Sequence, residues 1–233
     1  MTEDQRRRLR SLLAANGDGN SSAVAEICAL AVAELAVSGV WVTLISQAGT
    51  PATQRGLVCA TDATATQLEE LQFTVGEGPG LEAVTSGNAI LVPDLVVTAS
   101  RWPAFTSGAQ AAGVAAVFAF PLSLGAIRLG SLDCYRTTAG QLSSRQTAAA
   151  LILAEMTFEA VLSETAGRAH DDLGWITDIH AEVHQASGMV KYDLGVSLEA
   201  ALMRIRGYAY ANDMPIAVVA RRIVDRELFL EEE

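Results

Sequence analysis

The sequence HQASGMVKYDLGVSLEAALMRIRGYAYANDMPIAVVARRIV, which runs from His184 to Val224, predicts three short helices separated by two breaks. The first break is the tetrapeptide YDLG at 192–195. Ser197 follows it as a helix N-cap, and Glu199 lies in the first turn, where a carboxylate interacts favourably with the helix dipole. The second break ends at Pro215, the first position of the last helix, where the missing proline N–H costs nothing.

The middle helix has a predicted apolar face flanked by arginines and tyrosines. At about 100° per residue, five apolar residues fall on one arc and are expected to be buried. Arg206 and Tyr210 flank this arc on one side. Arg204 and Tyr208 flank it on the other. The residues of the arc are Leu198, Ala201, Leu202, Ile205 and Ala209, and the inward residues of the last helix are Ile216, Val219, Ala220, Ile223 and Val224.

Ordered small and apolar positions in all three helices resemble the ANTAR family, bacterial RNA-binding modules that act as transcription antiterminators. The resemblance covers roughly residues 171 to 228. Ser187 stands where the family usually has Lys, which removes one phosphate contact, and Ile205 harmlessly replaces the usual Leu. The matching residues are Ala186 to Val190, Ser197 to Ala200, Ile205-Arg206, Tyr208-Ala209, Pro215, Val219-Ala220 and Ile223-Val224.

The ANTAR resemblance implies binding of a messenger RNA leader folded as two small hairpins, with one loop held by each protein copy. This binding would stabilise an RNA fold that is incompatible with the terminator hairpin, so antitermination and a homodimer are expected. Small residues let an RNA loop approach closely, basic residues supply charge and planar hydrogen bonds, and a tyrosine offers a stacking face. The expected RNA-binding residues are Ala186, Ser187, Gly188, Lys191, Arg204, Arg206 and Tyr210.

Charge narrows the kind of nucleic acid that this chain can bind. The formal net charge is −11, which argues against non-specific binding because such binding depends on neutralising phosphates. From Lys191 to Arg226, however, the sequence contains six basic and four acidic residues. This small local excess of positive charge suits recognition of a few unpaired loop bases. The alternatives are that these arginines form an ordinary solvated helix face, or that the C-terminal helices bind a protein partner rather than RNA.

Cysteine use and hydropathy predict a soluble, cytoplasmic protein. Cys28, Cys59 and Cys134 are an odd number and lie far apart in apolar runs, so neither a disulfide framework nor a zinc site is expected. The basic residues 6–8 do not begin a signal peptide, because residues 11–22 contain no apolar core of useful length. No run of eighteen uncharged apolar residues occurs, so no contact with a membrane is expected.

The first two thirds of the chain alternate predicted helices and strands. Residues 40–46, 56–60 and 90–92 are β-rich, and the apolar runs 114–124 and 127–135 predict an antiparallel hairpin across the intervening glycine. Helical spacing occurs before the first strand, between the strands, and from about residue 141 onward. Antiparallel strands flanked by helices predict an α+β domain.

This part of the chain resembles a GAF domain over about residues 22 to 164. The resemblance rests on the order of elements and on the motifs Gly76-Glu77-Gly78-Pro79-Gly80-Leu81-Glu82-Ala83, Ser86 to Ile90, Val92 to Leu95 and Pro121-Leu122. The glycine-rich run is not a Walker loop, because it lacks the Gly-Lys-Ser/Thr ending. The expected layout is an N-terminal tail at 1–21, a GAF-like domain at 22–164, a helical connector at 165–172, an ANTAR-like domain of three helices at 173–228 and an acidic tail at 229–233.

The GAF resemblance implies binding of cyclic nucleotides, haem, bilins, another small molecule or nothing. His170, His180 and His184 all lie beyond this domain, so none of them can ligate haem within it, and the Asn-Lys-Phe-Asp-Glu pattern of cyclic-nucleotide GAF domains is absent. No cofactor is identified. The candidate lining of a small-molecule pocket is Trp102, Phe105, Phe118 and Phe120, and the alternative is that these four aromatic residues are plain core.

Two further patterns contain residue types that occur in reactive or metal sites. Cys134 is a candidate redox sensor, but the carboxylate of Asp133 beside it disfavours the thiolate. The run from His180 to His184 is not a zinc-protease motif, because its glutamate lies two residues after the first histidine and no third ligand follows. With no nucleophile–base set, the chain is not expected to be an enzyme. The expected function is signal-responsive RNA-binding regulation of transcription.

The segment that precedes the C-terminal helices carries a candidate dimer contact. Leu173, Ile176, His180 and Val183 recur at spacings of three and four, which suits pairing with a second copy. The alternative is that this face packs on the two helices that follow it.

Overall fold

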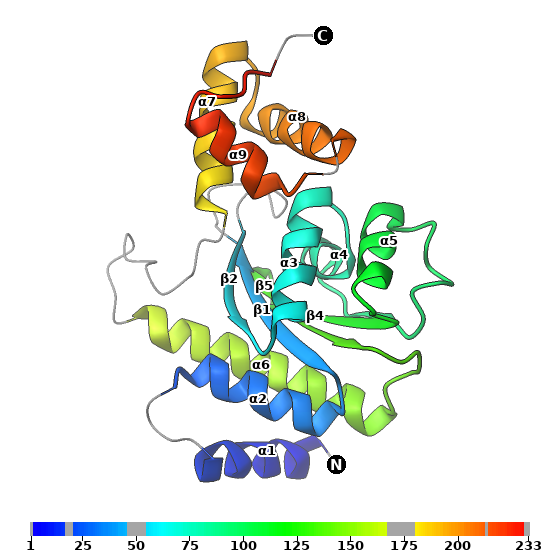
Figure 1. The fold of residues 1–233 in the computed structure, drawn as a ribbon. Helices are drawn as coiled ribbons and strands as arrows, with labels where there is room; N and C mark the ends of the chain where they lie inside the picture. The colour runs from blue at the N-terminus through cyan, green and yellow to red at the C-terminus, as the bar shows by residue number, and fades with distance from the viewer. Residues whose placement is uncertain (1, 17–20, 46–54, 167–179, 213, 231–233) are drawn as a thin grey trace.

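The computed structural model describes residues 2–16, 21–45, 55–166, 180–212 and 214–230. Its centre is a five-stranded antiparallel sheet with the strand order β2-β1-β5-β4-β3, covered by helices on both faces (Figure 1). The expected α+β class with an antiparallel sheet is therefore confirmed. The strands are β1 (Gly39–Ile45), β2 (Arg55–Ala60), β3 (Ile90–Val92), β4 (Ala116–Leu124) and β5 (Ile127–Arg136).

The β4–β5 hairpin shows how the sheet separates two cores. The two strands pair from Ala116↔Arg136 to Leu124↔Ile127, and Gly125 adopts a positive φ of 61° in the turn. Side chains alternate between the faces of a strand, so neighbouring residues of β4 enter different cores. Phe118 packs with the helices on one face, whereas Val117 packs with those on the other.

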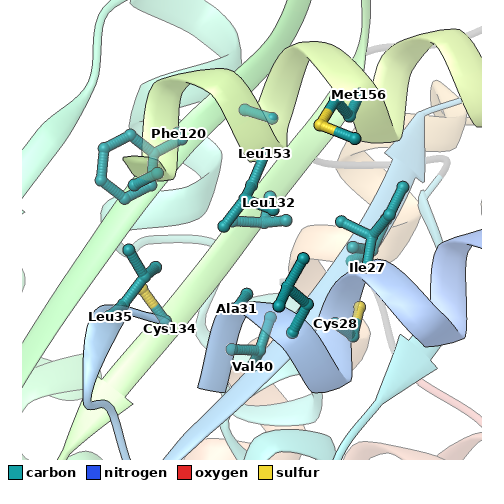
Figure 2. Packing of buried hydrophobic residues seen from close by; sticks show 14 of the residues in the cluster. Ile27, Cys28, Ala31, Leu35, Val40, Phe120, Leu132, Cys134, Leu153 and Met156 are labelled. Carbon is teal, nitrogen blue, oxygen red and sulfur yellow. The ribbon is translucent and has the colours of Figure 1, made fainter. Parts of the chain in front are cut away.

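One face of the sheet is covered by α2 (Ala23–Leu35) and α6 (Ser144–Ala166). Ser22 caps α2 by accepting a hydrogen bond from the Ala25 N–H at 3.2 Å. Figure 2 shows how side chains of α2, α6 and the central strands interdigitate in this core. The residues labelled there are Ile27, Cys28, Ala31, Leu35, Val40, Phe120, Leu132, Cys134, Leu153 and Met156.

The expected N-terminal tail is instead a helix, α1 (Thr2–Asn16), which packs on α2 and α6 (Figure 1). Leu9 is fully buried in the core of this face. Arg8 pairs with Glu34 at 2.6 Å, and Arg6 pairs with Glu155. The sequence analysis did not predict this helix, which is held on the domain by the apolar contact of Leu9 with the core.

The opposite face of the sheet is covered by α3 (Ala63–Val75), α4 (Pro79–Ser86) and α5 (Pro103–Ala111). Asp62 caps α3 by accepting from the Ala65 N–H at 2.8 Å, and Gly76 ends the helix with a φ of 71°. Gly78 has a φ of 143° and Pro79 begins α4. The glycine-rich motif is therefore the tight connection between two helices.

The C-terminal end forms a separate bundle of α7 (Ala181–Leu194), α8 (Leu198–Ala211) and α9 (Ile216–Val224). Ser197 caps α8 by accepting from the Ala200 N–H at 3.1 Å, and Gly195 ends α7 in the left-handed region. Both lie at the breaks that the sequence predicted. The buried residues of α8 are Ala201, Leu202, Ile205 and Ala209, and those of α9 are Ile216, Val219, Ala220 and Ile223.

The described elements overlap most of the expected layout. Helix α6 ends at Ala166, so the sheet domain extends two residues beyond its expected end. Residues 167–172 of the expected connector, 173–179 of the expected C-terminal domain and 231–233 of the acidic tail lie outside the described residues. No described helix has the length and apolar character that crossing a bilayer requires.

All three cysteines are free thiols, but two of them meet although they are 31 positions apart in the sequence. The Cys28 and Cys59 side chains are in contact, which raises the pKa of Cys28 and lowers that of Cys59. Cys134 is fully buried, and burial together with the charge of Asp133 raises the pKa of its thiol well above the usual range. Cys134 is therefore a poor thiolate, as its neighbour predicted.

Replacing Ile205 with Ala should destabilise the C-terminal bundle. Ile205 is fully buried at the centre of α8, so the lost methyl groups leave a cavity that costs about 2–5 kcal/mol of unfolding free energy. The matched control is Met203→Ala on the same helix, where the side chain is 66% exposed and a change within about 0.5 kcal/mol is expected. Hydrogen exchange of the α7–α9 amides measures both. Equal effects of the two variants would contradict the assigned helical phase.

Candidate ligand site and its contact with the C-terminal helices

A buried ion pair lies between the sheet and α3. Arg55 of β2 donates from Nη2 to Oε2 of Glu69 at 2.6 Å, and their side chains are 3% and 0% exposed. Removing two charges from water costs several kcal/mol per ion, which only close pairing and further hydrogen bonds offset. Burial raises the pKa of Glu69, while the charge of Arg55 and the nearby Thr43 and Trp41 side chains oppose that shift.

A second buried carboxyl group lies beside this pair. Asp133 of β5 is fully buried and accepts a hydrogen bond of 2.6 Å from the Ser131 hydroxyl. Burial raises the pKa of Asp133 to about 7, and the neighbouring charge of Glu69 adds to the shift, while Ser131 and Arg55 oppose it. One guanidinium and two carboxyl groups therefore share one interior region.

The glycine-rich connection lets α4 approach this region closely. A Cβ atom on Gly80 would lie 2.7 Å from Oδ1 of Asp133, and one on Gly78 would lie 2.5 Å from Oε1 of Gln72. The same Gln72 oxygen accepts from the Gly80 N–H at 2.8 Å. These two glycines therefore make room for Asp133 and Gln72 as well as permitting the turn.

The polar cluster, defined as Arg55, Glu69, Gln72 and Asp133, presents unused hydrogen-bonding atoms. Among the described residues, Nε and Nη1 of Arg55, Nε2 of Gln72 and Oδ1 of Asp133 are buried without a protein partner. Buried polar atoms are nearly always hydrogen-bonded to protein or to ordered molecules. The cluster thus combines buried donors and acceptors that the described protein atoms leave without a partner.

The C-terminal bundle contacts the sheet domain at the end of α3, close to this cluster. His180 stacks on the Phe73 ring with 3.5 Å between ring centroids and 10° between planes, and His184 approaches it edge-on at 5.9 Å. Arg206 of α8 donates from Nε to the Phe73 carbonyl at 2.9 Å, and its guanidinium lies 5.3 Å from the ring centroid. Phe73 is fully buried by these contacts.

Electrostatics link this contact to the polar cluster. Burial lowers the pKa of His180 to about 3, and the charges of Arg55, His184 and Arg206 lower it further. Burial also lowers the pKa of Arg206 to about 10, with the charge of Arg55 as a second cause. His180 is therefore neutral near pH 7, and the positive charge of Arg55 disfavours the charged forms of both His180 and Arg206.

Comparison with known proteins bears on the sheet domain. No protein-family model matches the sequence, and no curated protein matches it. The GAF domain of a phosphoenolpyruvate-protein phosphotransferase from Coxiella burnetii is similar with a TM-score of 0.55 and 14% identity, over 71% of this chain and 95% of that chain. The corresponding GAF domain from Acinetobacter has a TM-score of 0.51 and 10% identity, over 72% of this chain and 96% of that one. The sheet domain has the GAF fold. Similarity at these identities establishes the fold and not the ligand.

The four aromatic candidates do not line one pocket of the GAF domain. Trp102 and Phe105 pack in the core beneath α3, α4 and α5, whereas Phe118 and Phe120 pack on the other side of the sheet with α2 and α6. Each is at most 4% exposed. The pocket prediction was therefore wrong, and the alternative of plain core is correct, because the sequence shows that Phe118 and Phe120 share a face but not which helices cover it.

The sequence analysis does not predict the polar cluster, although three of its residues carry a weak signal. Asp133 is a charged residue inside an apolar strand. Glu69 and Gln72 lie at helical spacing from the buried Ala65 and Leu68, which places them on the inward face of α3. A polar residue at an apolar position of the pattern is the signal that could have identified them.

The expected RNA-binding residues divide into buried and exposed groups. Ala186 is fully buried and Ser187 is 2% exposed, so neither can touch RNA in this conformation. Ser187 donates to the Val183 carbonyl at 2.7 Å, which satisfies its hydroxyl inside the bundle. Their assignment as RNA contacts is corrected because this face of α7 packs on α8 and α9. The remaining residues are the exposed Gly188, Lys191 and Tyr210 and the half-buried Arg204 and Arg206.

Arg206 is not the solvent-exposed residue that its position beside the apolar arc predicted. Its side chain is half-buried and contacts the GAF domain at Phe73. Replacing Arg206 therefore affects the interdomain contact as well as any RNA contact. Helical periodicity places a residue on a face of its own helix but says nothing of another domain beside that face.

Two residues of the candidate dimer contact pack within this chain instead. His180 and Val183 are buried within this chain, His180 on Phe73 and Val183 in the bundle core. For Val183 the alternative of packing on the following helices is confirmed. Leu173 and Ile176 lie outside the described residues, as does His170. Within the described part of the chain, no group of three or more His, Cys, Asp or Glu side chains is placed to hold a metal ion.

A groove of about 870 Å³ runs along the boundary between the GAF domain and the bundle. Its walls come from α3 and α5 on one side and from the end of α8 and the start of α9 on the other. Leu71 and Val75 face Ala209, Tyr210 and Met214 across it. The groove leaves Tyr210 74% exposed although it adjoins the GAF domain.

Replacing Asp133 with Asn should change the pH dependence of stability. Because burial raises the pKa of Asp133 to about 7, its stabilising contribution is full below the ordinary Asp pKa and is lost as pH rises toward about 7. In the variant this loss disappears, so its unfolding free energy rises relative to wild type by about 1.4 kcal/mol for each pKa unit of the shift. Urea unfolding between about pH 4 and pH 8 measures the difference.

The matched control is Asp4→Asn, because the Asp4 side chain is 80% exposed and the variant should keep the wild-type pH dependence. Parallel stability curves for wild type and Asp133→Asn would show that Asp133 ionises normally.

Proposed function

We propose that this protein is a signal-responsive RNA-binding regulator of transcription. In this proposal the GAF domain senses a small molecule at the polar cluster, and the C-terminal bundle is an ANTAR-like module that binds RNA hairpin loops and prevents termination. The observation that carries the proposal is that the bundle keeps Gly188, Lys191 and Tyr210 exposed on helices whose sequence resembles ANTAR. The protein would act in the cytoplasm, as a regulator rather than an enzyme.

The exposed surface of the bundle supports RNA recognition. A Cβ atom added at Gly188 or Gly207 would meet nothing within 4 Å, so a bulky ligand can approach both helices closely. Tyr192 and Tyr210 are 87% and 74% exposed, and rings in that state can stack on unpaired bases. Lys191 adds an exposed positive charge on the same helix as Tyr192.

Binding of two loops supports a dimer. A single loop held by one small module binds weakly, and a second linked site raises the effective concentration. Helix α6 offers a surface for pairing, because Leu151 and Leu162 are 47% and 43% exposed. Their separation of eleven residues places both on one side of the helix. A homodimer through α6 would present two bundles to one RNA leader.

A protein partner is the second candidate for the bundle. Met203 and Phe229 are 66% and 62% exposed, and Val218 is 44% exposed. Exposed large apolar side chains are frequent at protein interfaces. A partner that docks on these residues would make the C-terminal helices a protein-binding module.

RNA binding by the full-length protein tests the proposal. Wild type should bind a two-hairpin RNA more tightly than a scrambled RNA of the same length at physiological salt. Tyr210→Ala should weaken that binding about fivefold to a hundredfold, because loss of one base–aromatic stack costs about 1–3 kcal/mol. Lys191→Ala should weaken binding to all RNAs and reduce its salt dependence.

Arg7→Ala is the control, since its side chain is 78% exposed on α1, far along the chain from the bundle, and the change should leave RNA affinity unaltered. Equal affinity of wild type for hairpin and scrambled RNA would sink the proposal. If wild type binds neither RNA, and if Met203→Asp abolishes the binding of a protein partner that wild type retains, the partner-binding function is favoured instead.

A further inference from the structure

Phe73 belongs to two domains at once. The GAF helix α3 carries it, yet it lies in the core cluster of the C-terminal bundle with Ile205 and Ala209 of α8. Within the described residues, it is the one buried member of that cluster that the GAF domain supplies. The bundle therefore docks on the sensor through a specific residue rather than through a diffuse surface.

Arg206 completes this contact from the bundle side. The Phe73 carbonyl lies in the last turn of α3, where backbone oxygens have no partner within the helix, and the Arg206 Nε–H binds it at 2.9 Å. A positive charge at a helix C-terminus is also favoured by the helix dipole. Arg206 thus caps α3 and is withheld from other ligands.

Gly76 makes the close approach of Arg206 possible. A Cβ atom at Gly76 would lie 3.0 Å from Nη1 of Arg206 and 3.3 Å from its Cζ. Gly76 also has a φ of 71°, so it is both the C-cap of α3 and the space that the guanidinium occupies. Any side chain there meets the group that holds the bundle in place.

The contact between Arg206 and Phe73 lies near a second positive charge, that of Arg55. Arg55 is close enough to lower the pKa of both His180 and Arg206, and Glu69 is the carboxylate that pairs with Arg55. Neutralising Glu69 would leave Arg55 uncompensated and would strengthen its repulsion of Arg206. Glu69 lies one helical turn before Phe73 on α3, so the Arg55–Glu69 pair adjoins the docking contact, and negative charge in the polar cluster favours the docked state.

We propose that this contact is an autoinhibitory latch. While the bundle is docked on Phe73, Arg206 is not available to other ligands. Loss of negative charge from the polar cluster, for example when a cationic ligand binds there, releases the bundle. The latch rests on the proposed function only for the consequence that released Arg206 joins the RNA-binding surface. The release itself is a change in the accessibility of Arg206, which can be measured without RNA.

Gly76→Asn in the full-length protein tests the latch. Asn is the side chain that adopts a positive φ most readily, and its Cβ atom, with the amide beyond it, would press on the Arg206 guanidinium and force it to shift. The reaction of Arg206 with phenylglyoxal, read by peptide mass spectrometry, should rise about tenfold, as expected for losing one charge-assisted hydrogen bond. Arg7, which is 78% exposed, serves as the internal reference.

The matched control is Gly113→Asn. Gly113 also has a positive φ, 78°, but a Cβ atom there would meet nothing within 4 Å. This variant should keep Arg206 as protected as in wild type. Unchanged protection of Arg206 in Gly76→Asn would overturn the latch.

Glu69→Gln tests the link to the polar cluster. The substitution removes one negative charge with little change in shape, and it should raise the phenylglyoxal reactivity of Arg206 in the same direction as Gly76→Asn. Glu159→Gln, at a residue 58% exposed on α6, is the control and should change nothing. Full protection of Arg206 in folded Glu69→Gln would overturn the control of the latch by cluster charge.

RNA affinity separates failure of the latch from failure of the proposed function. Gly76→Asn should bind the two-hairpin RNA about tenfold more tightly than wild type. If Arg206 becomes reactive and neither protein binds RNA, the latch is supported and the RNA-binding function is wrong. If wild type binds RNA and Gly76→Asn, with Arg206 reactive, binds it no better, the contact is not autoinhibitory.

Discussion

The buried ion pair between Arg55 and Glu69 is the constraint around which the helices on one face of the sheet domain are arranged. Two desolvated charges require each other at short range, so β2 at the sheet edge and α3 above it are held in one relative position. Helix α3 in turn fixes Gln72, which receives the start of α4, and Phe73, which receives the bundle. A change at this pair is therefore expected to affect both the start of α4 and the C-terminal bundle.

The sequence predicted local structure well where a pattern repeats along one element. The phase of α8 follows from its own spacing, and Ile205 is buried as that spacing requires. The cap at Ser197 and the turn at Gly125 likewise depend on neighbouring residues alone. Helix α1 is the exception, because the sequence predicts a tail at 1–21, whereas Leu9 of this helix is buried in the core beside α2 and α6.

The candidate site was harder to predict because its members meet across long sequence distances. Glu69 and Asp133 are separated by 64 positions and share no motif, and only the sheet register and the packing of α3 bring them together. Arg206 and Phe73 are separated by 133 positions, so periodicity placed Arg206 beside an apolar arc and could not reveal the second domain there. Ser187 is polar, but its hydroxyl donates a hydrogen bond to a carbonyl of its own helix, so the side chain can be buried.

The dual membership of Phe73 also determines how the molecule comes apart. While its ring is part of the bundle core, loss of α3 removes a wall of that core, so we expect the sheet domain and the bundle to unfold as one cooperative unit. Once the bundle has undocked, each part must rely on its own core and the two become separate foldons. The number of cooperative unfolding transitions is thus set by the position of a single aromatic ring.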